Sequence, residues 1–135
     1  MSDFTLADHK YMACALKLAK KGQFSSHPNP QVGCVIVIDD KVIGEGWHQS
    51  YGAPHAEINA LSSATQSVTG ATVYVNLEPC SHQGKTGPCC EALIRAGVAK
   101  VVIACEDPYE KVAGKGIAAL NSAGIKVSIG LFESE

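Results

Sequence analysis

The sequence predicts a three-layer α/β/α sandwich built on a mixed five-stranded sheet. Short β-branched runs, which are typical of buried strands, alternate with segments of helical periodicity. A chain of 135 residues with 46% hydrophobic content suits one compact domain with a buried core. Strands that are separated by helices favour parallel pairing, with helices on both faces of the sheet.

The first three elements can be placed from residue periodicity. A helix is expected over 5–21, where apolar residues recur at helical spacing. Residues 32–38 form a β-branched run that predicts a buried strand, and Asp39-Asp40 then turns the chain into a second strand over 41–47. These two strands are expected to pair as an antiparallel hairpin.

Proline and glycine mark the later elements. Pro54 and Pro88 are each placed to open a helix, because the first turn leaves its N–H groups unpaired anyway, and Gly97 closes the second of these helices. The other expected elements are a helix over 115–123 and strands over 71–76, 99–105 and 125–129, with the Pro54 helix reaching 64. Ligands bind such sheets beyond the carboxyl ends of the strands, so the loops that follow the strands are expected to gather there.

Composition and charge exclude several classes of protein. A formal net charge of −2 without a cluster of Lys and Arg argues against nucleic-acid binding. No stretch approaches the roughly 20 apolar residues of a membrane span. The N-terminal residues lack the basic flank and apolar run of a signal peptide, so a cytoplasmic protein is expected. Cysteines are reduced in that compartment, and metal binding or catalysis explains them better than disulfides.

The six cysteines divide by their context. Three lie in apolar segments and are expected to be core residues: Cys14, Cys34 and Cys105. The other three lie among Pro, Gly, Ser and His, where a core role is less natural: Cys80, Cys89 and Cys90. The second group is therefore the source of candidate metal ligands.

His55, Cys80 and Cys89 form a predicted zinc site. One imidazole and two thiolates leave a fourth tetrahedral position for water, as in catalytic zinc sites. Cys89 lies at the expected start of a helix, where the helix dipole favours the thiolate. Cys90 is an alternative third ligand.

Glu57 is the predicted catalytic residue. Zinc lowers the pKa of a bound water to about 7, so that hydroxide can attack a ring carbon bearing an amine, and a neighbouring carboxylate can move the protons that release ammonia. The pattern H-x-E, followed by P-C and a further cysteine, matches the signature of zinc deaminases. Eight residues separate Cys80 from Cys89, so the usual short cysteine spacing is lengthened.

Five segments carry a more specific signal. They are Asn29–Cys34 (NPQVGC), Gly44–His48 (GEGWH), Pro54–Glu57 (PHAE), Cys80–Cys90 (CSHQGKTGPCC) and Val112–Gly116 (VAGKG). Together they resemble the riboflavin-biosynthesis pyrimidine deaminases over essentially the whole chain. The resemblance implies the cytidine deaminase-like fold, one zinc ion per chain and the deamination of diaminohydroxyphosphoribosylaminopyrimidine.

The resemblance also implies a binding site for this phosphorylated pyrimidine and a homo-oligomer, with a dimer favoured. The residues expected to bind the substrate are Asn29, His48, His82, Lys85, Thr86 and Asp107. The chemistry agrees, since Lys85 suits a phosphate or a ring carbonyl and His82 can both donate and accept hydrogen bonds. Each has a structural alternative, such as helix capping for Thr86 or turn formation for Asp107.

Two features depart from the family pattern. Tyr109-Glu110 stands where the family usually has Asn-Pro. This favours a second interpretation, a related zinc deaminase that acts on another nucleobase, nucleoside or nucleotide. Many family members continue into a reductase domain, whereas residues 1–135 are expected to form a single deaminase domain. A zinc-stabilised binding module is the alternative from another class, and the open fourth ligand position argues against it.

Overall fold

The five predicted strands form one sheet, in the order β2-β1-β3-β4-β5. The computed structural model describes residues 4–22, 32–47, 55–77, 89–105 and 115–130. The strands are β1 (Gly33–Ile38), β2 (Lys41–Trp47), β3 (Thr72–Leu77), β4 (Lys100–Cys105) and β5 (Lys126–Ile129). β1 is antiparallel to β2 and β3, whereas β3, β4 and β5 are parallel, so the predicted mixed sheet is confirmed.

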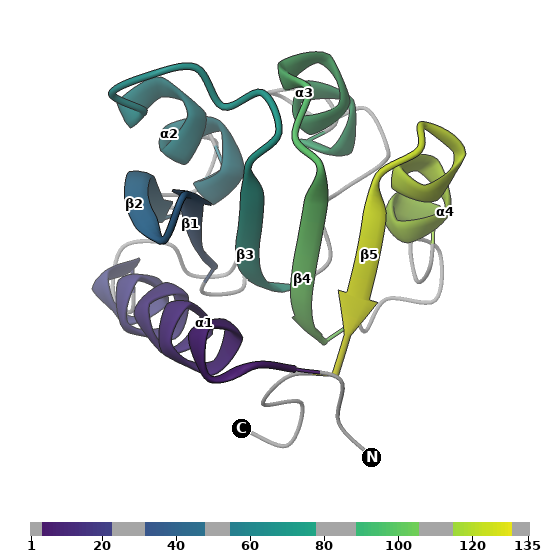
Figure 1. Cartoon of the computed structure of the whole chain (residues 1–135). Coiled ribbons are helices and arrows are strands. Elements are labelled where there is room, and N and C mark those ends of the chain that lie inside the picture. Colours follow the sequence, from purple (N-terminus) through teal and green to yellow (C-terminus); the bar gives the residue numbers. More distant parts are fainter. Residues whose placement is uncertain (1–3, 23–31, 48–54, 78–88, 106–114, 131–135) are drawn as a thin grey trace.

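Helices cover both faces of this sheet and confirm the predicted three layers. They are α1 (Leu6–Ala19), which continues into a 3₁₀ turn at Lys20–Gly22, α2 (Ala56–Ser63), α3 (Cys89–Ala96) and α4 (Lys115–Ser122). Figure 1 shows α1 on one face and the other three helices on the opposite face. Among the described residues, no helix is long and apolar enough to cross a membrane.

The predicted hairpin is confirmed, and the backbone angles of its turn explain why two aspartates stand there. Asp39 and Asp40 both have positive φ angles, of 51° and 61°. Two successive residues with positive φ form the tight turn that matches the right-handed twist of paired strands, and Asp tolerates this conformation better than most residues. The register begins at once, with Ile38 opposite Lys41.

The strand order differs in one respect from the sequence-based expectation. β2 and β3 are separated along the chain by α2 and run in the same direction, as expected. They do not pair, because β1 lies between them in the sheet. Cys34 of β1 is opposite Gly46 of β2 on one side and Val75 of β3 on the other. The burial pattern gives the reason: β1 is buried along almost its whole length, as a central strand must be, whereas β2 exposes several residues and takes the edge.

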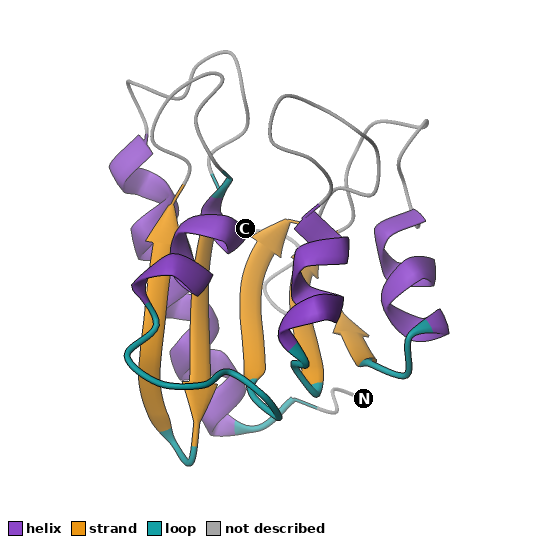
Figure 2. Ribbon diagram, turned by 90° about the horizontal axis from the view of Figure 1, so that it is seen from above, coloured by secondary structure: helices purple, strands orange, loops and turns teal. Residues whose placement is uncertain are grey.

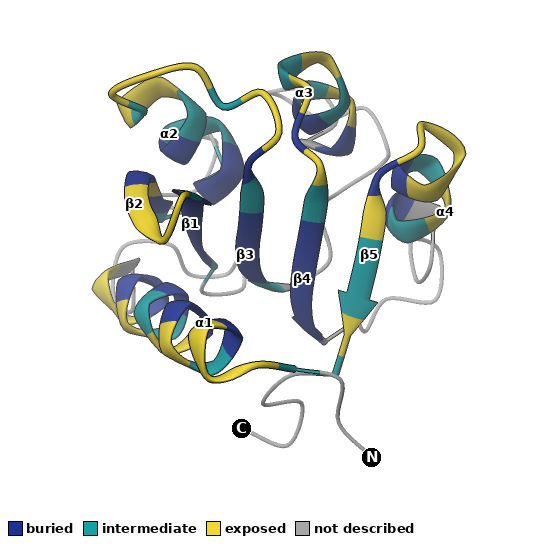
Figure 3. Ribbon diagram, in the orientation of Figure 1, coloured by how far each residue is buried: buried dark blue, intermediate teal, exposed yellow. Residues whose placement is uncertain are grey.

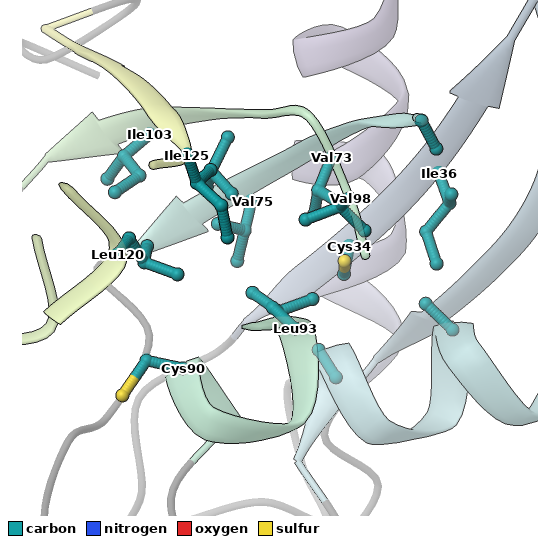
Figure 4. Packing of buried hydrophobic residues seen from close by; sticks show 14 of the residues in the cluster. Cys34, Ile36, Val73, Val75, Cys90, Leu93, Val98, Ile103, Leu120 and Ile125 are labelled. Atoms are coloured by element: carbon teal, nitrogen blue, oxygen red, sulfur yellow. The ribbon is translucent and has the colours of Figure 1, made fainter. Parts of the chain in front are cut away.

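Alternate residues of the strands fill two separate hydrophobic cores. Val73 and Val75 face α2, α3 and α4, whereas Tyr74 between them faces α1. Figure 4 shows the larger core, in which Leu93 of α3 and Leu120 of α4 lie against these strands. Figure 3 shows that the buried residues continue along β1, β3 and β4, which form the centre of the fold.

A buried polar network joins α1 to β3. Thr5 and Asp8 form a capping box at the start of α1, and the Tyr74 hydroxyl donates a hydrogen bond of 2.6 Å to the Asp8 carboxylate. Burial alone would raise the pKa of Asp8, but the hydrogen bonds from Tyr74 and from the Thr5 backbone N–H outweigh it, and the pKa lies below its ordinary value of 3.8. The folded state therefore favours the ionised carboxylate.

We expect Tyr74→Phe to lower the free energy of unfolding by about 1–3 kcal/mol at pH 7, because the buried Asp8 carboxylate loses one of its two hydrogen-bond donors, Tyr74 and the Thr5 N–H. A depressed folded-state pKa adds stability above the unfolded pKa and loses it as the pH falls through the folded pKa. The difference between variant and parent should thus shrink below about pH 4. Urea unfolding at several pH values measures this.

Tyr11→Phe is the matched control for that experiment. The Tyr11 hydroxyl donates at 2.6 Å to the side chain of Asp40, which is exposed and can bind water when the donor is lost. A smaller loss of about 1 kcal/mol or less is expected for this variant. Equal losses for the two variants would contradict the special role of the buried Asp8.

Candidate active site at the carboxyl end of the sheet

The carboxyl ends of the parallel strands meet the starts of the helices at one edge of the sheet (Figure 2). β2 and β3 are both antiparallel to β1, and β3, β4 and β5 are parallel, so four strands end at this edge. The described residues at this edge include the strand ends Trp47, Leu77, Cys105 and Ile129, and the residues that precede or begin helices, His55, Cys89 and Lys115. The sequence-based expectation of a common edge is confirmed for these residues.

The first turn of α2 brings His55 and Glu57 to this edge. His55 is the N-cap, with extended backbone angles (φ −72°, ψ 167°), so α2 starts at Ala56 and not at Pro54 as the sequence suggested. The His55 side chain does not cap the helix. Glu57 lies in the first turn and is 3% exposed. The positive end of the helix dipole stabilises a carboxylate in this position.

Cys34 of β1 lies in the buried layer near Glu57. The side chain of Cys34 is fully buried in the same cluster as Ala56 and Ala60 of α2. Burial, and then the negative charge of Glu57, raise the pKa of the Cys34 thiol well above its usual value. Cys34 therefore stays a neutral thiol, and the expectation that it is a core residue is confirmed.

Two contacts fix the first turn of α2 against the end of β2. A Cβ atom on Gly46 would lie 2.5 Å from the Ala60 nitrogen and 2.6 Å from the Ala56 carbonyl oxygen, so only glycine allows this approach. The Asn59 side-chain amide donates a hydrogen bond of 2.9 Å to the Trp47 carbonyl. Sequence reasoning missed Asn59, and no local signal marks it, because half of the eight residues of α2 are polar.

Ser63 at the end of α2 and Thr65 just after it bind further backbone groups of β2. The Ser63 hydroxyl lies 2.9 Å from both the backbone N–H and the carbonyl oxygen of Glu45. The Thr65 N–H donates to the Ile43 carbonyl at 2.9 Å. Glu45 and Trp47 alternate along the strand, and Ile43 is the extra residue at a bulge between the pairs Ile36–Gly44 and Val37–Val42. Each of these three residues therefore has a backbone hydrogen bond to α2 or to the residues that follow it.

The predicted zinc ligands are only partly within the described residues. His55 is described, as is the backbone of Cys89 at the start of α3, whereas Cys80 and the Cys89 side chain lie outside. Within the described part of the chain, no three His, Cys, Asp or Glu residues are grouped to hold a metal ion. The donor types still fit zinc, because imidazole and thiolate groups are the ligands that zinc prefers.

Cys90, the alternative third ligand, is 4% exposed and belongs to the larger hydrophobic core. Figure 4 shows it at the start of α3, at the margin of this core. Its role as an alternative third ligand stays a prediction. The substrate-binding residues that the sequence predicts all lie outside the described residues: Asn29, His48, His82, Lys85, Thr86 and Asp107.

The chain is similar in sequence to known deaminases. A profile of the cytidine and deoxycytidylate deaminase zinc-binding region matches residues 6–105. The riboflavin biosynthesis protein RibD of Escherichia coli is 58% identical over 130 residues, which cover 96% of this chain and 35% of that protein. The diaminohydroxyphosphoribosylamino-pyrimidine deaminase of Buchnera aphidicola (subsp. Schizaphis graminum) is 52% identical over 130 residues, which cover 96% of this chain and 88% of that protein.

The fold is similar as well. A solved structure of RibD from Acinetobacter baumannii matches with a TM-score of 0.92 and 55% sequence identity, over 95% of this chain and 36% of that one. This chain thus spans about a third of the length of the two RibD proteins. The predicted cytidine deaminase-like fold is confirmed.

Proposed function

Because this chain belongs to the cytidine and deoxycytidylate deaminase family, we propose that it is a zinc-dependent hydrolase that deaminates diaminohydroxyphosphoribosylaminopyrimidine in riboflavin biosynthesis. The observation that carries the proposal is the buried Glu57 beside His55, in the first turn of α2 at the carboxyl end of the sheet. The relatives named RibD and diaminohydroxyphosphoribosylamino-pyrimidine deaminase support this substrate.

His55, Cys80 and Cys89 would hold one zinc ion in this proposal. Bound zinc would lower the pKa of water and so supply a nucleophile at neutral pH. Cys89 is suited to its part because the N–H groups and dipole at the start of α3 favour its thiolate.

Glu57 would transfer the protons. Its carboxylate can take a proton from the attacking water and deliver a proton to the leaving amine, which departs as ammonia. Burial shields this exchange from bulk water, and the start of α2 stabilises the ionised carboxylate before the first transfer and after the second. The neutral thiol of Cys34 adds no competing charge beside it.

The phosphorylated pyrimidine would be bound by the residues that the family resemblance indicates, with Lys85 available to a phosphate or a ring carbonyl. We further propose a single deaminase domain over residues 1–135, a homo-oligomer with a dimer favoured, and a cytoplasmic location. One sheet with helices on both faces supports the single domain. Nucleic acid and membranes are not proposed as partners.

A second candidate is a related deaminase that acts on another nucleobase, nucleoside or nucleotide. Tyr109, which replaces the usual Asn of the family, is the observation that favours it. A binding module in which zinc is only structural is disfavoured, because a buried carboxylate two residues from the predicted ligand His55 has no role in such a module.

The deciding experiment is an ammonia-release assay on the purified chain, with zinc measured in the same sample. We expect about one zinc per chain. Ammonia should be released from diaminohydroxyphosphoribosylaminopyrimidine, and cytidine and guanine should stay inert. Turnover of another amine in place of the pyrimidine would support the second candidate, and a folded chain without zinc would contradict both.

A further inference from the structure

The position of α2 depends on contacts outside the helix. A helix of eight residues is not stable alone in water, so its place on the sheet is set by tertiary contacts. Gly46 sets how closely α2 approaches β2, since any side chain there would meet the backbone of the first turn. Close packing alone does not fix how far the helix slides along the strand. A directional bond is needed for that.

We propose that Asn59 is a positioning residue for the deamination, and this rests on the proposed function. Its hydrogen bond of 2.9 Å to the Trp47 carbonyl joins the first turn of α2, which carries Glu57, to the last residue of β2. Glu57 is two residues before Asn59, so both lie within the same turn and a half of helix. Asn59 thereby sets where the Glu57 carboxylate stands relative to the end of the sheet.

Trp47 is a firm anchor for this bond because both layers of helices hold it. Its ring packs against the smaller core beneath α1, and the Lys21 ammonium lies 4.8 Å from the centre of the ring. Its carbonyl accepts the bond from Asn59 on α2. The acceptor residue, Trp47, is therefore held by contacts on the α1 side of the sheet, and the donor, Asn59, ties α2 to it. A displacement of about 1 Å at a reacting group can cost about a hundredfold in rate, so this bond matters for turnover.

Ser63 provides a matched comparison on the same helix. It bonds the same strand edge at Glu45, one helical turn further from Glu57. A purely structural role predicts that Asn59→Ala and Ser63→Ala behave alike. A positioning role predicts that kcat falls about 10- to 100-fold in Asn59→Ala, with KM little changed, and stays at the parent value in Ser63→Ala. Asn59→Asp keeps the size but lacks the N–H donor, and it should behave as Asn59→Ala does.

The experiment measures kcat, KM, the denaturant midpoint and the rate at which a chelator removes zinc from the parent and these variants. Zinc should leave Asn59→Ala faster than Ser63→Ala, because the N-cap of the displaced turn is His55. Equal kcat values for Asn59→Ala and Ser63→Ala, or parent kcat in Asn59→Asp, would overturn the proposal. If the parent releases no ammonia from the pyrimidine, the proposed function fails; equal zinc-release rates in the two alanine variants would then overturn the role of Asn59 separately.

Discussion

Glu57→Gln should reduce kcat by about 10²- to 10⁴-fold, because an amide cannot take a proton from water and return one to the leaving amine. Glutamine has nearly the same shape, so the buried space at the start of α2 stays filled. Glu57 is not among the predicted ligands, and zinc should therefore be retained. Ammonia release and zinc content, measured on the same preparation, check this prediction.

Glu45→Gln is the matched control for that substitution. The residue lies on β2 with an exposed side chain, and its hydrogen bonds to Ser63 involve only its backbone. The same chemical change at this position should leave kcat at the parent value. Parent-level turnover in Glu57→Gln would remove Glu57 as the proton carrier, whatever the zinc content.

Among the described glycines, Gly33 is where substitution by alanine should lower the free energy of unfolding most. A Cβ atom there would lie 2.0 Å from the Ala15 carbonyl oxygen and 2.6 Å from the Ala19 nitrogen, both backbone atoms of α1. Backbone atoms cannot avoid the clash by changing rotamer, so α1 must move off β1. We expect a loss of about 3 kcal/mol or more in the free energy of unfolding, at the upper end of overpacking costs.

Gly70→Ala separates this clash from the effect of adding a methyl group elsewhere. Gly70 has a φ of +81° and no atom within 4 Å of the added Cβ. The alanine there has only backbone strain, worth about 1–2 kcal/mol. Urea unfolding should rank Gly33→Ala well below Gly70→Ala in stability, and the reverse ranking would contradict the close approach of α1 to β1.

Local signals in the sequence were enough to predict the helices and strands, but not which strands lie next to each other in the sheet. Asp39-Asp40 marked the hairpin turn and Gly97 the end of α3, because these residues suit backbone angles that others avoid. Periodicity reports which face of a strand is buried, not which strand lies beside it. The insertion of β1 between β2 and β3 therefore could not be predicted from the helix that separates them.

The chemically active residues of the candidate site could be predicted from the sequence, but the residues that surround and position them could not. His55 and Glu57 were indicated by their residue types and spacing, and the structure brings both to the expected edge of the sheet. Asn59 and Cys34 act through contacts with residues more than ten positions away, to Trp47 and Glu57. No local pattern reports such contacts, because they depend on how α2 lies across two strands.

The row of hydrogen bonds from α2 and Thr65 to β2 also limits how copies of this chain can associate. An exposed edge strand is a template onto which a second chain can add a strand, and this is a common route to fibrous aggregates. On β2 the carbonyls of Ile43 and Trp47, and both the N–H and the carbonyl of Glu45, already have hydrogen-bond partners in the chain itself. We therefore expect a strand that adds along this part of β2 to compete with α2, the helix that carries Glu57, for the same backbone groups.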